Sequence, residues 1–291
     1  MLRLPALFTV PGDALAGAAA AGVRPGRGTA LAIGASVCLY EAGMALNDYA
    51  DREVDAVERP HRPIPSGRIR PRSALTAAVV LTGAGLGLAA AAGRRTLAVG
   101  AALAGAVWAY DLRLKETAAG PGAMAAARGL DLLMGAVASG MGPPGSAPLR
   151  AAGVLAAHTY AVTAVSRHEA RGGSAGAPAA ALAATLAIAE TLRRTSADAI
   201  AVPASTAPST TAHDVTTAAC LAYAGAAVRP YAHAVLNPSA PLTQRAVGSG
   251  IKAMLPLQAA LTARRGAPVT AGVLLTLIPI ARRQARKVSV T

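Results

Sequence analysis

Residues 28–55 read GTALAIGASVCLYEAGMALNDYADREVD, a run of apolar residues that ends in a cluster of acids. The apolar segment covers 28–47, and the acids after it include Asp48, Asp51 and Asp55. On a continuous helix the spacing i, i+3 and i+7 places these three carboxylates within roughly 60° of one another. Such a face repels itself unless a cation lies on it. Clustered carboxylates at a membrane edge therefore indicate Mg²⁺ carrying a diphosphate.

The composition is typical of a membrane protein. The chain has 291 residues, of which 53% are hydrophobic and 14% charged, and its mean hydropathy is +0.42. Soluble domains of this length carry more charge and fewer apolar runs. A net charge of +14 would indicate nucleic acid in a soluble protein. Here the basic residues lie in short loops between apolar segments, so we expect contacts with membrane lipid and no nucleic-acid partner.

Apolar segments follow one another along the whole chain, each near the length that crosses ~30 Å of hydrocarbon. They are 4–23, 28–47, 73–92, 96–110, 122–141, 148–166, 177–192, 214–235, 247–263 and 267–281. Several are short or interrupted by Gly and Pro, so the sequence predicts nine or ten spans. The expected fold is all-α: a polytopic membrane protein with a single domain over 1–291. The stretch 196–212, rich in Ser, Thr, Ala and Pro, is predicted to be an exposed loop.

The distribution of Lys and Arg predicts the orientation in the membrane. The first-motif loop, residues 48–72, is the most basic loop and is expected to be cytoplasmic, which puts the N-terminus inside. Loop 111–121 and the second-motif loop, residues 167–176, then also face the cytoplasm. The arginines at 94–95 and 193–194 would then lie on the opposite side of the membrane, where the positive-inside rule does not expect them.

Basic residues follow the acids of the first-motif loop directly. Asn47 adds a neutral oxygen ligand before the aspartates, and Arg59, Arg62 and Arg68 come after them. Carboxylates hold Mg²⁺, Mg²⁺ holds phosphate oxygens, and guanidinium groups bind the remaining oxygens in bidentate fashion. The alternative is a solvated loop with ordinary ion pairs. The spacing, the preceding Asn and the membrane edge favour a metal–diphosphate site.

These motifs resemble the first signature of the UbiA superfamily of intramembrane prenyltransferases. The matching residues are Asn47-Asp48-x-x-Asp51-x-x-x-Asp55, Arg59-Pro60-x-Arg62-Pro63-Ile64-Pro65-Ser66-Gly67, Tyr110-x-x-x-Leu114-Lys115 and Arg128-Gly129. The resemblance implies about nine helices around a central cavity and a cytoplasmic cap of short loop helices. It also implies transfer of a prenyl group from a prenyl diphosphate to an acceptor, with Mg²⁺ as cofactor.

Carried onto this sequence, the resemblance implies roles for individual residues. The catalytic acids would be Asp48, Asp51 and Asp55. The metal ligands would be Asn47, Asp48, Asp51, Asp55 and Glu169. The groups that bind the diphosphate would be Arg59, Arg62, Arg68, Lys115, Arg128, Arg167 and Arg171. Two roles stay open: Lys115 could be a topology signal, and Arg128 could instead pair with Asp131 on the same helix to offset burial.

The second-motif loop departs from the family pattern. Where the family has paired aspartates after the sixth helix, residues 166–173 read SRHEARGG, and Glu169 is the only carboxylate. Glu169 could complete one metal site, or Arg167 and Arg171 could replace metal charge at the phosphates. An Arg–Glu ion pair is the plain alternative. Together with 250–260, GIKAMLPLQAA, this altered motif resembles the EboC-like branch of the superfamily.

The expected function is therefore that of an intramembrane prenyltransferase of the cell membrane. Two alternatives stay open: a transporter or flippase of phosphorylated or lipid-linked metabolites, and a non-catalytic membrane partner that only binds prenyl diphosphate.

Glu41 is a carboxylate inside an apolar segment, which indicates either a functional group or an ion-pair partner on another helix. The acceptor and the prenyl length are not indicated by the sequence.

Overall fold

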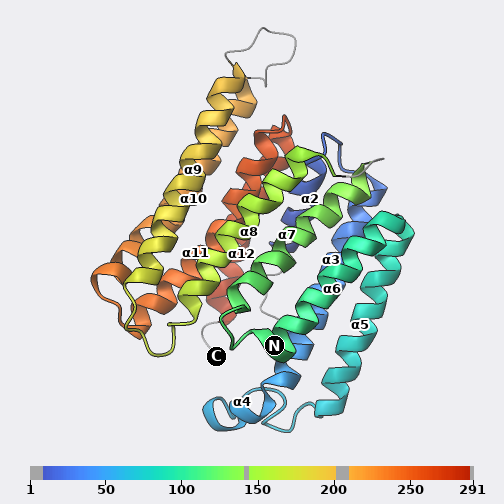
Figure 1. The fold of residues 1–291 in the computed structure, drawn as a ribbon, viewed down its shortest axis with the longest axis vertical. Helices are drawn as coiled ribbons and strands as arrows, with labels where there is room; N and C mark the ends of the chain where they lie inside the picture. The colour runs from blue at the N-terminus through green and yellow to red at the C-terminus, as the bar shows by residue number, and fades with distance from the viewer. Residues whose placement is uncertain (1–8, 141–143, 201–209, 289–291) are drawn as a thin grey trace.

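The structure is a computed structural model that describes residues 9–140, 144–200 and 210–288 (Figure 1). Its regular elements over these residues are helices. The first half of the chain forms α2 (Val10–Ala20), α3 (Arg27–Ala50), α4 (Arg52–Glu58), α5 (Pro71–Ala92), α6 (Arg94–Ala109), the π-helical turn η1 (Tyr110–Leu114) and α7 (Gly120–Ser139). The second half forms α8 (Ser146–Ser166), α9 (Gly176–Ile200), α10 (Thr210–Leu236), α11 (Ala240–Ala263) and α12 (Pro268–Val288).

The long helices follow the apolar segments of the sequence. Within the described residues, α2 has 11 residues and nine other helices have between 16 and 27. By length and hydropathy alone, three described stretches are long and apolar enough to cross a membrane: Arg27–Ala50, Pro71–Ala92 and Arg94–Leu114. The all-α fold is confirmed, and the predicted number of spans stays a prediction. The loop predicted over 196–212 is shorter, because 196–200 belong to α9 and 210–212 to α10; residues 201–209 lie outside the described part.

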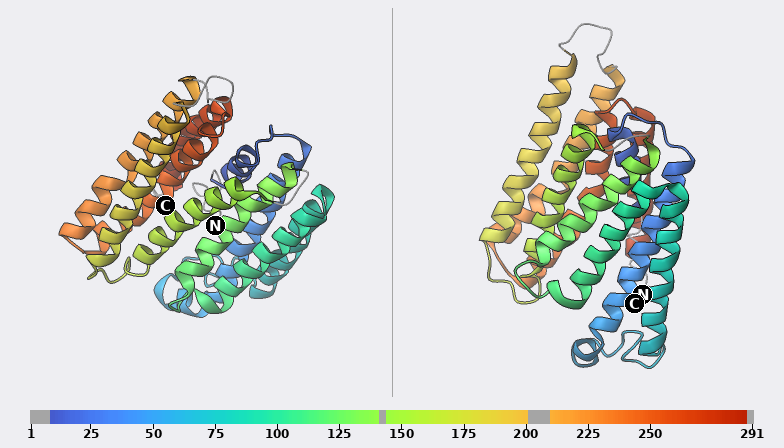
Figure 2. Two further views of the ribbon diagram at one scale, coloured as in Figure 1. Left: turned by 45° about the horizontal axis from the view of Figure 1, so that its top comes forward. Right: turned by 45° about the vertical axis from the view of Figure 1, so that its right-hand side comes forward.

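Two neighbouring groups of helices make up the bundle (Figure 2). Helices α3, α5 and α6 form one group, and α9, α10, α11 and α12 form the other. Helices α2, α7 and α8 join them: α2 contacts both α7 and α11, and α7 contacts α6 and α8. Residues from both halves of the chain therefore meet at α2, which contacts α7 of the first half and α11 of the second.

Glycines allow α2 and α7 to pack closely. A Cβ on Gly17 would lie 2.1 Å from the carbonyl oxygen of Leu132, and one on Gly135 would lie 2.4 Å from the Cα of Ala14. No larger side chain fits at either position. Small residues permit this close approach between membrane helices. The crossing brings the buried side chain of Asp13 next to α7.

The motif end of the bundle, as we call it, is the end at which α4 lies in Figure 1. The connections 51–70, 115–119, 167–175 and 237–239 lie at this end, because successive long helices run up and down. In the described part of this cap, α4 and η1 are the short helical elements, and the second-motif loop consists of turns and irregular backbone. The expected cap of loop helices is thus built mainly from the first half of the chain.

Candidate active site

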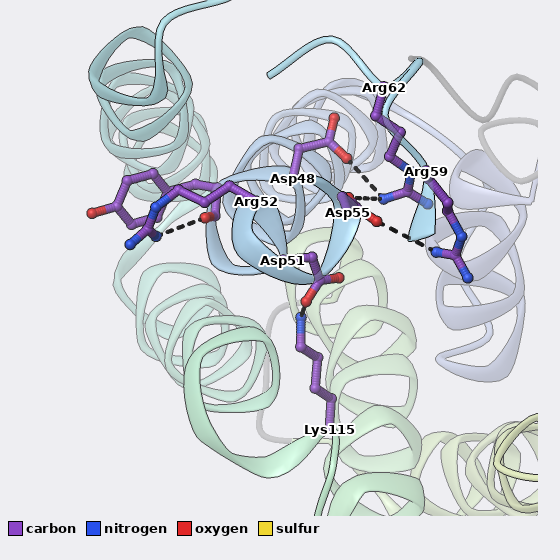
Figure 3. A network of polar contacts seen from close by, with 8 residues as sticks. Asp48, Asp51, Arg52, Asp55, Arg59, Arg62 and Lys115 are labelled. Atoms are coloured by element: carbon purple, nitrogen blue, oxygen red, sulfur yellow. Dashed lines mark hydrogen bonds and ion pairs between the residues drawn. The ribbon is translucent and has the colours of Figure 1, made fainter. Parts of the chain in front are cut away.

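The first-motif aspartates lie around a break between two helices. Asn47 and Asp48 belong to the last turn of α3, Asp55 belongs to α4, and Asp51 lies between the helices with φ −86° and ψ 1°. The three carboxylates therefore do not share one helical face, and that expectation is wrong. Aspartate has low helix propensity, and the side chain of Asp51 instead contacts a lysine from another element. Figure 3 shows Asp48 and Asp55 on one side of the break and Asp51 on another.

Arg62 joins two of the aspartates. Its Nη1 lies 2.8 Å from Oδ2 of Asp55 and 3.5 Å from Oδ1 of Asp48. Arg59 adds a second guanidinium, with Nη1 3.6 Å from Oδ1 of Asp55 (Figure 3). The side chain of Asp55 is only 2% exposed, so its charge depends on these partners. The structure thus brings together four predicted site residues from α3, α4 and the turn after α4.

Lys115 supplies the cation for the third aspartate. Its ammonium group donates to Oδ1 of Asp51. The backbone N–H of Lys115 donates to the carbonyl oxygen of Tyr110 at 3.0 Å. This bond reaches back five residues, as is typical of a π-helix, and it closes the π-turn η1. This turn ends α6 and directs the lysine toward the first motif. Asp111 is buried nearby, close enough to interact electrostatically with both Lys115 and Asp51.

Asp111 was missed by the sequence analysis. A detectable signal was present, because an acid four residues before a lysine is a helical i, i+4 pair at the end of an apolar segment. The family motif specifies Tyr110 and Lys115 but leaves the position of Asp111 between them variable. Two carboxylates, those of Asp51 and Asp111, therefore lie beside Lys115.

Arg68 has a local role in the structure. Its Nη2 donates to the carbonyl oxygen of His61 at 2.6 Å, and its Nε donates to Oγ of Ser66 at 3.0 Å. Both acceptors belong to the same turn, next to Gly67 with its φ of +76°. Arg68 is therefore placed to hold the turn that positions Arg62. Its predicted contact with diphosphate stays a prediction.

The second-motif loop is held by contacts to a neighbouring loop and to α11. Arg167 donates to the carbonyl oxygen of Thr117, two residues after Lys115. The carbonyl oxygen of Glu169 accepts from Nε2 of Gln244 at 3.3 Å, and Arg171 is exposed. The loop therefore touches the connection that carries Lys115. In the described part of the chain, no three His, Cys, Asp or Glu side chains converge to hold a metal ion, so Glu169 does not form such a group with the aspartates.

Arg128 lies in the interior of the bundle, where α2 crosses α7. Its Nη1 is 2.7 Å from Oδ2 of Asp13, and its Nη2 donates to Oγ1 of Thr9. Gln258 of α11 donates to Oδ1 of Asp13 at 2.5 Å. Asp13 is 115 positions away in the sequence and is the ion-pair partner that Asp131 was expected to be. Asp131 instead accepts a hydrogen bond from the hydroxyl of Ser36 on α3.

The comparison with family models decides the classification. The model of the UbiA prenyltransferase family matches residues 6–279. The chain belongs to the UbiA prenyltransferase family. Family membership and the apolar helices make it an integral membrane protein. The sequence resemblance to UbiA proteins is thus confirmed, whereas the resemblance to the EboC-like branch stays a prediction.

Relatives of known name share part of the chain. A digeranylgeranylglyceryl phosphate synthase of Methanopyrus kandleri is 43% identical over 114 residues, 39% of this chain and 40% of that protein. The enzyme of the same name from Halobacterium salinarum is 38% identical over 144 residues, 48% of this chain and 50% of that protein. The matched stretches thus span half or less of these relatives.

Solved UbiA structures share the fold. The apo structure of a UbiA homologue from Aeropyrum pernix K1 superposes with a TM-score of 0.66 at 18% identity, covering 95% of this chain and 99% of that one. A UbiA homologue from Archaeoglobus fulgidus bound to GPP and Mg²⁺ gives a TM-score of 0.60 at 18% identity, covering 89% and 95%. At this identity the likeness extends to the fold alone.

The donor groups of this UbiA chain fit Mg²⁺ in one particular way. Mg²⁺ prefers oxygen ligands and usually takes one or two carboxylates together with water and substrate phosphates. Asp48 and Asp55 approach the same Nη1 of Arg62, so their carboxylates lie close together and could share a cation. A closed cage of protein ligands is not required for such a site. The pair of carboxylates with nearby arginines therefore fits a metal that arrives with a diphosphate.

Proposed function

We propose that this protein is a Mg²⁺-dependent prenyltransferase that moves a prenyl group from a prenyl diphosphate to a small-molecule acceptor and releases diphosphate. The observation that carries the proposal is the pairing of acids and bases at the end of α3. Asp48 and Asp55 form ion pairs with Arg62, and Asp51 forms one with Lys115. These pairs lie at the end of α3, which is long and apolar enough to cross a membrane. This arrangement provides ligands for the metal and cations for the phosphates at one place.

The residues of the chain would divide the work as follows. Asp48 and Asp55, which share Arg62, would hold Mg²⁺, and Asp51 and Asn47 remain further proposed ligands. When bound, Mg²⁺ would neutralise charge on the departing diphosphate. Arg59, Arg62 and Lys115 now contact the aspartates and would turn to phosphate oxygens once the metal takes up the carboxylates. Arg68, Arg128, Arg167, Arg171 and Glu169 remain further proposed contributors to this site.

Shelter from water is a second task of the chain. The carbon–oxygen bond of an allylic diphosphate breaks with positive charge on carbon, and water would capture that carbon. Ala42 and Leu46 of α3 are buried, and Met44 and Ala45 line an apolar pocket that reaches Asp48. A prenyl chain lying along these residues would keep its reactive carbon out of water while its diphosphate stays at the motif end.

Orientation completes the proposal. The motif end carries the first-motif loop, Lys115 and the second-motif loop, which hold most of the loop arginines. Positive charge favours the cytoplasmic side of a membrane. We therefore place the motif end in the cytoplasm, where soluble prenyl diphosphates and Mg²⁺ are supplied. Relatives named digeranylgeranylglyceryl phosphate synthase and structures bound to GPP and Mg²⁺ support the choice of substrate class.

The experiment that tests this function uses the purified protein in lipid nanodiscs with labelled prenyl diphosphates of several lengths and a lipid extract. We expect Mg²⁺-dependent release of diphosphate and a prenylated product detected by mass spectrometry. Asp48→Ala should reduce the rate at least about 1,000-fold, since it removes a charge aimed at the leaving group. Full activity of Asp48→Ala would overturn the assignment.

A matched control lies in the same loop. Glu53 is an exposed acid of α4 that pairs with Arg52 at 2.9 Å and belongs to none of the proposed site groups. Glu53→Gln should keep the rate of the wild type within about twofold, as is usual for exposed ion pairs. Movement of lipid phosphates across proteoliposomes without diphosphate release would favour the transporter alternative instead.

A further inference from the structure

Two acids and one base are buried together where α2 crosses α7. Asp13 of α2 is 0% exposed and Asp131 of α7 is 6% exposed. The carboxyl groups of the two acids lie within hydrogen-bond reach of each other. Nη1 of Arg128, one turn before Asp131 on α7, lies 2.7 Å from Oδ2 of Asp13. The proposed prenyl transfer uses neither acid, so the chemistry of the motif end does not explain why two carboxyl groups are buried at this crossing.

The formal charges of this cluster do not balance if both acids are ionised. Among the described residues, the cation that interacts with both acids is Arg128, which carries a single positive charge. The neighbours from α3 and α11, Ser36 and Gln258, are uncharged hydrogen-bond donors. One negative charge would therefore be left without a counterion in the interior of the bundle. Burial of an unpaired charge is costly, in a membrane protein above all.

His158 of α8 does not supply the missing positive charge. Its ring nitrogens lie 3.0 Å from the hydroxyl oxygen of Tyr223 and 3.1 Å from the carbonyl oxygen of Gly250, and both of these partners are uncharged. Among the described residues, the charged side chain close enough to interact with the ring is Arg128, which would repel a positive charge there. A neutral imidazole meets both partners with one donor and one acceptor. We therefore count His158 as uncharged.

The packing of the crossing favours a proton over a metal ion as the missing positive charge. A Cβ on Gly12 would lie 2.1 Å from Oε1 of Gln258, and Gly17 and Gly135 show similarly close contacts between α2 and α7. A cation such as Mg²⁺ needs about six oxygen ligands around it, whereas a proton needs no space of its own. Two carboxyl groups in contact commonly share one proton, because two like charges so close together cannot both persist in a buried place.

The hydrogen bonds of the cluster assign the negative charge to Asp13. Gln258 donates to Oδ1 of Asp13 at 2.5 Å, and the guanidinium group of Arg128 lies beside Oδ2. This Oδ2 is buried and accepts no well-directed hydrogen bond from the described residues, so it can accept one more. Among the same residues, the donor to Asp131 is the hydroxyl of Ser36. The ionised form is therefore stabilised more strongly at Asp13 than at Asp131.

We propose that Asp131 is a neutral carboxylic acid and that its O–H donates a hydrogen bond to the carboxylate of Asp13. The cluster is then neutral overall, with one ion pair between Asp13 and Arg128 and one proton held on Asp131. Asp131 is a positioning residue, because it holds Asp13, and Asp13 in turn holds Arg128 of α7 and Gln258 of α11. The inference goes beyond the proposed prenyl transfer and does not depend on it, so each can fail without the other.

Infrared spectroscopy of the full protein tests for this proton. The protein is measured in D₂O at about pH 8, where exposed carboxyl groups are ionised, in a maltoside detergent that has no carbonyl group. We expect the C=O stretching band of a protonated carboxyl group, which should shift when aspartate is labelled with ¹³C at its side-chain carboxyl carbon. Asp131→Asn should remove the intensity of one carboxyl group from this label-sensitive band. Absence of the band, or unchanged intensity in Asp131→Asn, would overturn the proposal.

Thermal unfolding of two matched variants tests which of the two acids is neutral. Asn has the shape of a protonated Asp, and its amide can donate to Asp13 as the O–H of Asp131 does. Asp131→Asn should therefore change the midpoint of unfolding by less than about 3 °C. Asp13→Asn removes the anion beside Arg128 and should lower the midpoint by at least about 8 °C, as for loss of one partner of a buried ion pair. Equal losses in the two variants, or a larger loss in Asp131→Asn, would contradict the assignment.

Asp214→Asn is the control for the chemical change itself. Asp214 is an exposed acid of α10 and lies outside the cluster. The variant should leave the label-sensitive infrared band unchanged and should move the midpoint of unfolding by less than about 2 °C, as is usual for surface substitutions. Loss of infrared intensity in Asp214→Asn, with none in Asp131→Asn, would place the proton elsewhere and overturn the proposal.

Discussion

The two motif loops of this protein lie at the same end of the bundle but are built differently. In the first-motif loop every signature aspartate has a cationic partner, and the chain forms the helix α4 around them. In the second-motif loop the backbone forms turns, and the described hydrogen bonds join it to carbonyl oxygens of neighbouring loops and to the Gln244 side chain of α11. Ion pairs between side chains hold the first loop, whereas hydrogen bonds to backbone carbonyl oxygens hold the second.

This difference indicates a division of labour within one cap. The N–H of Gly173 donates to the carbonyl oxygen of Pro238 at 2.7 Å, and Arg167 holds the carbonyl of Thr117. The second-motif loop therefore ties the α10–α11 connection to the one that carries Lys115. We infer that it supports the site mechanically, whereas the first-motif loop supplies the ligands. Four substitutions can break or sharpen this contrast.

The largest effect is expected for Arg62→Ala. The variant removes the guanidinium shared by Asp48 and Asp55. Among the described residues, the buried carboxylate of Asp55 then keeps the more distant Arg59 as its ion-pair partner. Prenyl transfer should fall at least about 100-fold, as for loss of a charged group at a leaving group. Initial rates at saturating Mg²⁺ measure this. A loss smaller than that of Arg171→Ala, the exposed arginine of the second-motif loop, would reverse the contrast between the loops.

Lys115→Ala should have the next largest effect. The lysine is 15% exposed and holds Asp51, so its removal exposes that aspartate to the nearby acid Asp111. We expect a loss of about 30-fold in rate, within the range for one electrostatic contact in a site. Lys115→Arg should restore part of the rate because the charge is kept. Equal rates for the Ala and Arg variants would show that the charge is irrelevant.

Glu169→Gln tests whether the second-motif loop takes part in metal binding. If the loop is mechanical, the rate and the Mg²⁺ concentration for half-maximal rate should change by less than about fivefold, as for most surface charges. The variant keeps the size of the side chain and the backbone contact to Gln244. A shift of the Mg²⁺ requirement by more than tenfold would restore Glu169 as a metal ligand.

The smallest effect on catalysis is expected for Gly172→Ala, which acts on stability. Gly172 has φ of +67°, and a Cβ there would lie 2.4 Å from the carbonyl oxygen of Pro238. Strain and this clash should cost about 2 kcal/mol or more. Gly67→Ala in the first-motif loop, with φ of +76° and open space around it, should cost only about 1 kcal/mol. Thermal unfolding in detergent compares the two; equal costs would contradict the backbone fit at Pro238.

Local patterns predicted most of the fold. Apolar segments such as 73–92 and 148–166 differ by two residues or fewer at each end from α5 and α8, because runs of apolar residues and flanking Gly, Pro and Arg mark where a helix begins and ends. The exposed loop over 196–212 was predicted too long, since its Ala and Thr residues also fit helix ends. Composition alone does not distinguish a solvated loop from a frayed helix.

The site was predicted in its members but not in its arrangement. Motif spacing located the aspartates, whereas the break at Asp51 depends on Lys115, 64 positions away. The partner of Arg128 was predicted on the same helix, and the structure gives Asp13 on α2 instead. Such pairs depend on which helices cross, here through Gly17 and Gly135. The spacing of residues within one sequence carries no record of those crossings.

The π-turn η1 has a consequence for how the protein tolerates insertions and deletions. Each hydrogen bond of a π-turn spans one residue more than in an α-helix, and the bond from Lys115 to Tyr110 is of this kind. Deleting a single residue from Tyr110–Leu114 would therefore convert the π-turn into a regular α-turn and leave the residues after it facing nearly the same way. The same deletion inside a regular helix would rotate everything after it by about 100° and carry the ammonium group away from Asp51. The π-turn is thus the place in this connection where the loss of one residue is best tolerated.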